Sequence, residues 1–296
     1  MTATRFRRAC LAVAWLATGA VLAAQQAATF RSGVDLVRLD VLVTQGGKPV
    51  GGLTADDFEV LDNGVRQPLR VATLAGSVSV VLVLDTSGSL EGPQLDQLIR
   101  ASQMVVGLLR PEDEVSLATF SWRLLMPAGS GRNPAAIRAA LASATASGTT
   151  ALWDALFGGL ALAGGSGGRS LVLLFTDGLE NASWLREEDV ADAAERSESV
   201  IYVVRPPGPA VPQSSLAAAK NRLRGIADRT GGSVVDTDTF GQLPQRFTAI
   251  LDEFRARYLL SYEPTGVRRD DGWHNVEVRV RGGRRTVKAR PGYYAR

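Results

Sequence analysis

Apolar and polar residues follow three successive patterns along the chain. Between residues 33 and 74 they alternate, and turn residues such as Asn63-Gly64 interrupt the alternation. Alternation bounded by turn residues predicts short antiparallel strands. From residue 78 the run VSVVLVLD is apolar at nearly every position, which is typical of a strand covered on both faces in a parallel sheet. We therefore place a domain boundary near residue 77.

After Asp85 a helical stretch followed by a buried strand recurs several times. The predicted helices cover residues 93–109, 134–144, 152–162, 187–197, 216–227 and 243–257. The predicted strands between them are EVSLATFSW, LVLLFTD, VIYVV and a short strand near 234–235. Repeated alternation of this kind predicts an α/β fold, with a doubly wound, mostly parallel sheet and helices on both faces.

The last part of the chain returns to alternating strands with Gly-rich turns. This flank, residues 258–296, and the N-terminal flank, residues 30–76, are each too small to bury much apolar surface alone. We therefore predict that the two flanks pair into one smaller β-sandwich. The α/β domain, residues 77–257, is predicted to be inserted between them.

The first residues have the pattern of a secretory signal peptide. Three arginines precede an apolar run that ends in small residues, Ala23 and Ala24. We expect cleavage after residue 24 and an exported protein, either periplasmic or secreted. The alternative is an uncleaved membrane anchor, and membrane association is expected only in that case.

Removal of this leader changes the charge balance. The leader holds three of the 33 basic residues and no acidic one, so 30 basic residues remain against 30 acidic ones. A formally neutral protein gives little support for nucleic-acid binding, which needs a basic surface patch. The single cysteine, Cys10, also lies in the leader, which excludes disulfides and thiolate metal sites from the exported protein. Any metal site must therefore use oxygen ligands or the single histidine.

Three segments place oxygen-bearing side chains where ligands bind in such folds. The segment Asp85-Thr-Ser-Gly-Ser89 directly follows the buried strand, and the carboxyl ends of strands form the binding edge of an open α/β sheet. The D-x-S-x-S string alone is a weak signal, and a helix N-cap at Ser89 is the alternative. Two further segments strengthen the signal. SGTTALWDA, residues 147–155, has threonines before a predicted helix, and LLFTDG ends another buried strand at Asp177 and Gly178.

The order and spacing of these residues resemble the metal-ion-dependent adhesion site of von Willebrand factor A domains. The resemblance covers roughly residues 78–257, and every position of the family's pattern is filled. In that pattern the threonine lies two positions before a leucine, which selects Thr150 over Thr149. The flanks, from VDLVRLDVLVT to RPGYYA, are similar to those of a largely uncharacterised bacterial group of exported proteins with related domains.

The resemblance implies a Rossmann-like fold with a site for Mg²⁺, with Mn²⁺ or Ca²⁺ as alternatives. The implied ligand set is Asp85, Ser87, Ser89, Thr150 and Asp177, in which the hydroxyls bind directly and the two carboxylates act mostly through water or by orienting the hydroxyls. An ion with neutral ligands keeps much of its positive charge and can accept an Asp or Glu carboxylate from a partner protein. The expected function is metal-dependent protein binding in adhesion or assembly, without enzymatic activity.

Two other functions are alternatives for this sequence. A metal-independent structural scaffold of an exported complex is compatible with the same fold. A serine hydrolase that uses Ser87 or Ser89 with His274 is less well supported, because the Asp85–Ser89 turn lacks the G-x-S-x-G elbow that exposes a nucleophile and the only histidine lies in the C-terminal flank. The chain also has no G-x-x-x-x-G-K-[ST] motif, so no nucleotide is expected. Asp154 is interpreted as a first-turn helix carboxylate and Glu180 as loop charge, outside the site. The sequence does not indicate an oligomeric state.

Overall fold

The computed structural model describes residues 36–74, 76–131, 133–165, 169–208, 211–268 and 272–295. Asp35–Arg296 form one compact unit, and the predicted leader lies outside the described residues. In the part of the chain that is described, no helix is long and apolar enough to cross a membrane.

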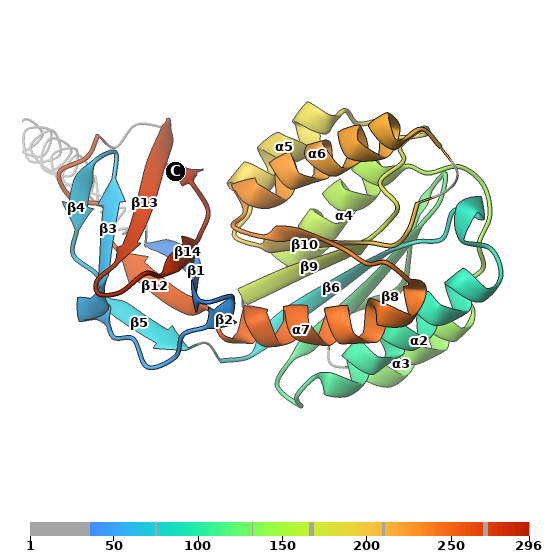
Figure 1. The fold of residues 1–296 in the computed structure, drawn as a ribbon, viewed down its shortest axis with the longest axis horizontal. Coiled ribbons are helices and arrows are strands. Elements are labelled where there is room, and N and C mark those ends of the chain that lie inside the picture. Colours follow the sequence, from blue (N-terminus) through green and yellow to red (C-terminus); the bar gives the residue numbers. More distant parts are fainter. Residues whose placement is uncertain are drawn as a thin grey trace, which may run out of the picture. The chain divides into compact units, whose positions relative to one another are not determined.

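A six-stranded sheet forms the centre of the α/β region, with strand order β11-β10-β9-β6-β7-β8 (Figure 1). Every neighbouring pair is parallel except β7 and β8, which are antiparallel. The strands are β6 (Val78–Asp85), β7 (Glu114–Phe120), β8 (Leu124–Gly131), β9 (Arg169–Phe175), β10 (Val200–Arg205) and β11 (Ser233–Asp236). The predicted doubly wound, mostly parallel sheet is therefore confirmed.

Helices cover both faces of this sheet (Figure 1). One face carries α2 (Pro93–Leu108), α3 (Pro134–Ala142) and α7 (Leu243–Arg255), and the other carries α4 (Leu152–Gly164), α5 (Glu187–Arg196) and α6 (Gln213–Arg229). Alternate residues of β6 enter the two cores: Val80 and Leu82 pack on the first face, and Val81 and Val83 on the second. This two-sided burial explains why the run VSVVLVLD is almost entirely apolar.

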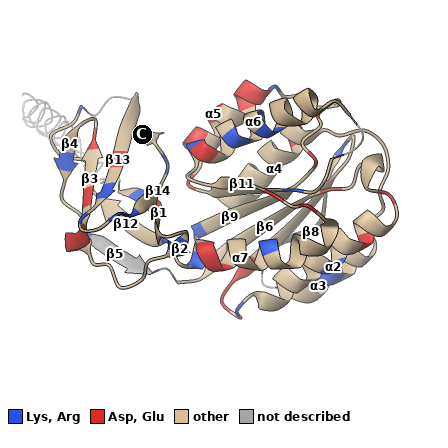
Figure 2. Cartoon of the chain, in the orientation of Figure 1, with Lys and Arg blue, Asp and Glu red and all other residues tan. Residues whose placement is uncertain are grey.

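Charged residues link two of the outer helices. Figure 2 shows acidic residues on α5 and basic residues on α6, and ion pairs join Arg222 to Glu187 and Arg229 to Glu195. The basic residues of α6 are thus partly matched by acidic neighbours on α5.

The edge strand β8 was not predicted. The chain turns at residues 121–123 after β7 and returns antiparallel to it, with two irregularities in the register. Pro127 lies within β8, and proline is tolerated in a sheet mainly at an edge because it cannot donate a backbone hydrogen bond. The run LLMPAGSG therefore gave no strand signal.

The two flanks form two antiparallel sheets. One has the order β14-β1-β12-β5, with β2 on β1; its strands are β1 (Val37–Gln45), β2 (Lys48–Pro49), β5 (Val71–Leu74), β12 (Tyr258–Tyr262) and β14 (Thr286–Lys288). The other has the order β15-β13-β3-β4, from β3 (Phe58–Asp62), β4 (Val65–Gln67), β13 (Trp273–Val280) and β15 (Gly292–Tyr294). Each sheet contains strands from both flanks, and the two share one core that includes Leu39, Val60 and Leu260. The predicted fold class is thus confirmed.

Short 3-10 helices complete the described elements, namely η1 (Ala55–Asp57), η2 (Gly88–Leu90) and η3 (Phe240–Gln242). Between α7 and β12 the fully buried Arg257 donates hydrogen bonds to the Gly231 carbonyl at 2.6 Å, the Tyr202 hydroxyl at 2.8 Å and the Asp40 carbonyl at 3.3 Å. Arg169 at the start of β9 also pairs with the Asp40 carboxylate of β1. Buried arginines therefore connect the α/β region to the flanking sheets.

Candidate metal centre

Asp85 ends β6 and fixes the turn that follows it. Its carboxylate accepts a hydrogen bond from the Ser87 amide on Oδ1 at 2.9 Å and another from the Thr176 hydroxyl on Oδ2 at 2.8 Å. The side chain is completely buried at the carboxyl end of the central strand. Asp85 therefore positions Ser87 and the start of η2 rather than reaching into solvent.

The environment of Asp85 disfavours its negative charge relative to water. The pKa of Asp85 is raised to about 6, because burial and, to a lesser extent, the nearby Asp177 outweigh the hydrogen bonds from Ser87 and Thr176, which lower it. A positive charge nearby favours the ionised form of a carboxylate. The arrangement is thus one that a bound cation would stabilise.

Ser87, Ser89 and Asp177 converge beside this turn. The Ser87 and Ser89 hydroxyl oxygens lie 3.2 Å apart, and the Ser89 hydroxyl donates to Asp177 Oδ2 at 3.2 Å. Asp177 is held by the Leu179 amide, which donates to Oδ1 at 2.9 Å. Because β6 and β9 are adjacent parallel strands, their carboxyl ends bring these three side chains together.

The loop that contains Thr150 is tied to the Asp85 turn by backbone hydrogen bonds. The Gly88 amide donates to the Gly148 carbonyl at 3.0 Å, and the Ser147 amide donates to the Thr86 carbonyl at 2.9 Å. Thr150 is buried, and its amide donates to Asn181 Oδ1 at 2.8 Å. Its hydroxyl makes no hydrogen bond to the residues that the structure describes. The alternative, Thr149, is exposed.

Three polar residues around the centre were not assigned a role in it from the sequence. Thr176 supports Asp85 and also accepts the Gly178 amide at 3.0 Å, and Asn181 holds both backbone groups of Thr150. Glu180 accepts the Leu152 amide at the start of α4 at 2.6 Å. The polar run that follows the buried strand β9 was the one sequence signal for these roles. It did not reveal the roles, because Asp85, Thr150 and Leu152, which these residues contact, lie far away in the sequence.

The donor set suits a hard cation. Among the described residues no group of three or more His, Cys, Asp or Glu side chains could hold a metal ion. The candidate centre contains two carboxylates, Asp85 and Asp177, and its other oxygens are the hydroxyls of Ser87, Ser89 and Thr150. Oxygen-only donors fit Mg²⁺, Mn²⁺ or Ca²⁺ better than softer ions.

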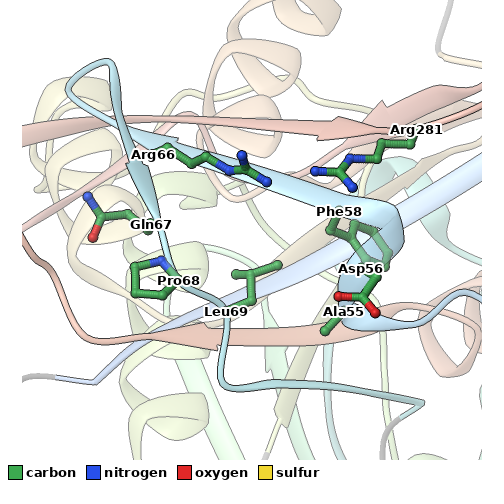
Figure 3. Close-up of a pocket in the computed structure, with 8 residues that line it drawn as sticks. All are labelled: Ala55, Asp56, Phe58, Arg66, Gln67, Pro68, Leu69 and Arg281. Atoms are coloured by element: carbon green, nitrogen blue, oxygen red, sulfur yellow. The ribbon is translucent and has the colours of Figure 1, made fainter.

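A separate cavity lies in the flanking sheets. It measures about 430 Å³ and is lined by residues that include Phe58, Leu69, Arg66 and Arg281. Figure 3 shows the guanidinium groups of the two arginines on the same side of this cavity, pointing toward each other. The carboxylate of Asp56 also lines the cavity, but two guanidinium groups outweigh its charge and disfavour a metal cation there.

His274, the base considered for a serine hydrolase, lies in the flanking sheets. It is buried on β13, and its Nδ1 lies 2.8 Å from Asp62 Oδ1 and 3.2 Å from the Tyr293 hydroxyl. The Ser87 and Ser89 hydroxyls interact instead with each other, with Asp85 and with Asp177. The structure therefore does not bring histidine and serine together as a hydrolase requires.

Comparison with known proteins identifies the family. The profile of the von Willebrand factor type A domain matches residues 79–249, which is more than half of the 296-residue chain. The chain therefore belongs to the von Willebrand factor type A domain family. No curated protein is significantly similar in sequence.

Several solved structures share the fold. A mutant of the PilB minor pilin from Streptococcus sanguinis is 14% identical with a TM-score of 0.51, and the match covers 62% of each chain. The von Willebrand factor type A protein from Catenulispora acidiphila is 16% identical with a TM-score of 0.51, over 76% of this chain and 52% of that one. The vWF domain of the type V pili tip protein Mfa5 from Porphyromonas gingivalis is 14% identical with a TM-score of 0.50. The match covers 60% of this chain and 94% of that one. At these identities the similarity concerns the fold.

Proposed function

We propose that this protein is a divalent-metal-dependent protein-binding module that acts in adhesion or assembly. One observation carries the proposal: the Ser87 and Ser89 hydroxyls and the Asp177 carboxylate converge within hydrogen-bonding distance, 3.2 Å, at the carboxyl ends of β6 and β9. With Asp85 and Thr150 they would hold Mg²⁺, or Mn²⁺ or Ca²⁺ in its place. A ligand set rich in neutral hydroxyls leaves the bound ion able to attract an Asp or Glu carboxylate from a partner protein.

Two further points support this proposal. The Thr150 hydroxyl, which has no hydrogen-bond partner among the described residues, is available as a ligand. Two proteins of the same fold are a minor pilin and a pilus tip protein, and the role in adhesion or assembly is proposed by analogy with them. The leader sequence supports an exported location, periplasmic or secreted.

Calorimetric titration with Mg²⁺ or Mn²⁺ tests the metal centre. We expect the wild-type protein to bind one of these ions, Asp85→Ala to abolish binding, and Ser89→Ala to weaken it by about 10–100-fold. Asp96→Asn is the matched control, because Asp96 is an exposed aspartate in the first turn of α2, and this variant should bind as the wild type does. Equal binding by wild type and Asp85→Ala would place the metal elsewhere.

A metal-independent scaffold is the second candidate. It is favoured by the hydrogen bonds from Ser87 to Ser89 and from Ser89 to Asp177, because they satisfy these groups without an ion. The two functions differ in unfolding experiments. A metal at about 100 times its Kd stabilises the folded protein by about 2.7 kcal/mol, which raises the Tm by roughly 5 °C for a protein of this size. An unchanged Tm in Mg²⁺ and in EDTA, with partner capture insensitive to chelation, would favour the scaffold.

A further inference from the structure

Two tryptophans are strongly exposed in the α/β region. The Trp184 side chain is 94% exposed and that of Trp122 is 55% exposed. Tryptophan is highly buried on average, so an indole left almost entirely in water is unusual. Tryptophan is also among the residues most enriched at the energetic centres of protein interfaces.

Both tryptophans adjoin the Thr150 loop, from two different neighbouring loops. Trp122 follows Ser121, whose carbonyl accepts the Ala151 amide at 2.7 Å. Trp184 follows Ser183, whose hydroxyl accepts the Trp153 amide at 2.9 Å. The two tryptophans therefore lie on two loops that hydrogen-bond the chain directly after Thr150, one of the proposed metal ligands.

The backbone that presents Trp184 is held in place by carboxylates. Asp154 accepts the Trp184 amide at 3.1 Å and the Leu185 amide at 2.9 Å. Glu180 accepts the Ser183 amide at 2.8 Å and the Ser183 hydroxyl at 2.6 Å. The exposed indole thus projects from a backbone that is already ordered, and a partner would not have to order it on binding.

Trp122 is supported in a different way. Its ring lies against Gly148, where an added Cβ would be 2.7 Å from the indole Cδ1 atom. The guanidinium of Arg123, an exposed residue, lies 4.8 Å from the ring centroid. This side of the candidate metal centre therefore combines an apolar surface with a positive charge, which complements an acidic partner.

We propose that Trp122 and Trp184, on two loops beside the metal centre, form a partner-binding surface, and that the partner is a protein whose acidic side chain lies among apolar residues. The acidic group would reach the metal while apolar neighbours pack on the two indoles. This inference rests on the proposed metal-dependent binding function. Beyond that function, it specifies that apolar residues surround the Asp or Glu of the partner protein.

Selection from a random peptide library tests this surface. The library is captured on immobilised wild-type protein in Mg²⁺ and eluted with EDTA, and the eluted peptides are sequenced. We expect enrichment of Asp or Glu flanked by apolar residues. The Trp122→Ala/Trp184→Ala variant should still enrich acidic peptides but lose the apolar preference, and it should bind the peptides selected on wild type at least about tenfold more weakly.

Two controls separate the possible outcomes. Phe157→Ala removes an exposed aromatic residue of α4 outside these loops and should leave the selection unchanged. Calorimetry should show unchanged Mg²⁺ binding by the double tryptophan variant. If EDTA elutes no acidic peptides, the proposed function fails and this inference fails with it. If acidic peptides appear without apolar neighbours, or bind the double variant as tightly as wild type, only the tryptophan surface is overturned.

Discussion

Replacement of Gly148 by alanine should destabilise the protein for two separable reasons. Gly148 has a φ of +78°, in the left-handed region that costs a residue with a side chain about 1–2 kcal/mol. A Cβ at this position would also lie 2.7 Å from Cδ1 of Trp122, so the indole would have to move; because Trp122 is 55% exposed, we expect this to cost about 1 kcal/mol, the low end of the range for overpacking. We expect Gly148→Ala to lower the free energy of unfolding by about 2–3 kcal/mol.

A matched control isolates the contribution of the clash. Gly47 has a φ of +77° in an exposed turn, and an added Cβ there would meet nothing within 4 Å. Gly47→Ala should therefore cost only the backbone strain, about 1–2 kcal/mol. In a Trp122→Ala background the clash is removed, and the cost of Gly148→Ala should fall to that of Gly47→Ala.

Urea unfolding followed by far-ultraviolet circular dichroism measures all these free energies. Equal costs for Gly148→Ala and Gly47→Ala, or the same cost of Gly148→Ala with and without Trp122, would refute the reasoning. Mg²⁺ titration adds a functional measurement. The backbone strain acts on residue 148 itself, whose carbonyl accepts the Gly88 amide at 3.0 Å, so relaxation of that strain should separate the two ligand loops and weaken metal binding.

Two further substitutions test how the α/β region is held together. Asp113→Asn should cost about 2–4 kcal/mol at neutral pH, because the carboxylate accepts the Val78 amide at 2.9 Å and pairs with Arg255 at 2.6 Å. These hydrogen bonds and the ion pair outweigh burial and lower the pKa of Asp113, so its stabilisation is present above about pH 4 and is lost as the pH falls through the folded-state pKa. Urea titrations across this range should show the difference between wild type and variant shrink in acid, and a constant difference would contradict the assignment. Arg257→Met should cost about 2–4 kcal/mol by leaving the Gly231 carbonyl unpaired, and a neutral result in the same assay would show that its hydrogen bonds add little.

The fold could be predicted mostly where the pattern of apolar residues within one segment shows which of its faces are buried. The run at 78–85 is apolar on both faces because each face meets its own layer of helices. The pairing of the flanks into antiparallel sheets could be predicted because neither flank can bury enough surface alone. Which strands are neighbours within each sheet could not be predicted from the sequence. For example, β1 pairs with β12, so that Val37 lies opposite Tyr262 although the two residues are far apart in the sequence. Strand β8 was missed because its position at an edge tolerates Pro127.

The candidate site was predictable to the extent that it depends on strand ends. Residues directly after buried strands meet at one edge of a parallel sheet, and the structure brings Ser87, Ser89 and Asp177 together there. The hydrogen bond from Thr176 to Asp85 could not be predicted, because it depends on β9 lying next to β6. The exposure of Trp184 was also out of reach, since it depends on how Asp154 and Glu180 fix the surrounding loop.

The interleaved flanks also determine which strands would bear a pulling force applied to the protein. The α/β region connects to the flanking sheets through β5 and β12, which are hydrogen-bonded neighbours, while β1 pairs directly with both β12 and β14. Tension applied at residues 36 and 295 is therefore borne by strand pairs of the flanking sheets, and the path of force does not pass through β6 or β9. A pulling force from a partner bound to the loops around Asp85 would instead be transmitted through the connections between β5 and β6 and between α7 and β12. The same chain thus has one load path that leaves the candidate metal centre unstressed and another that pulls on it directly.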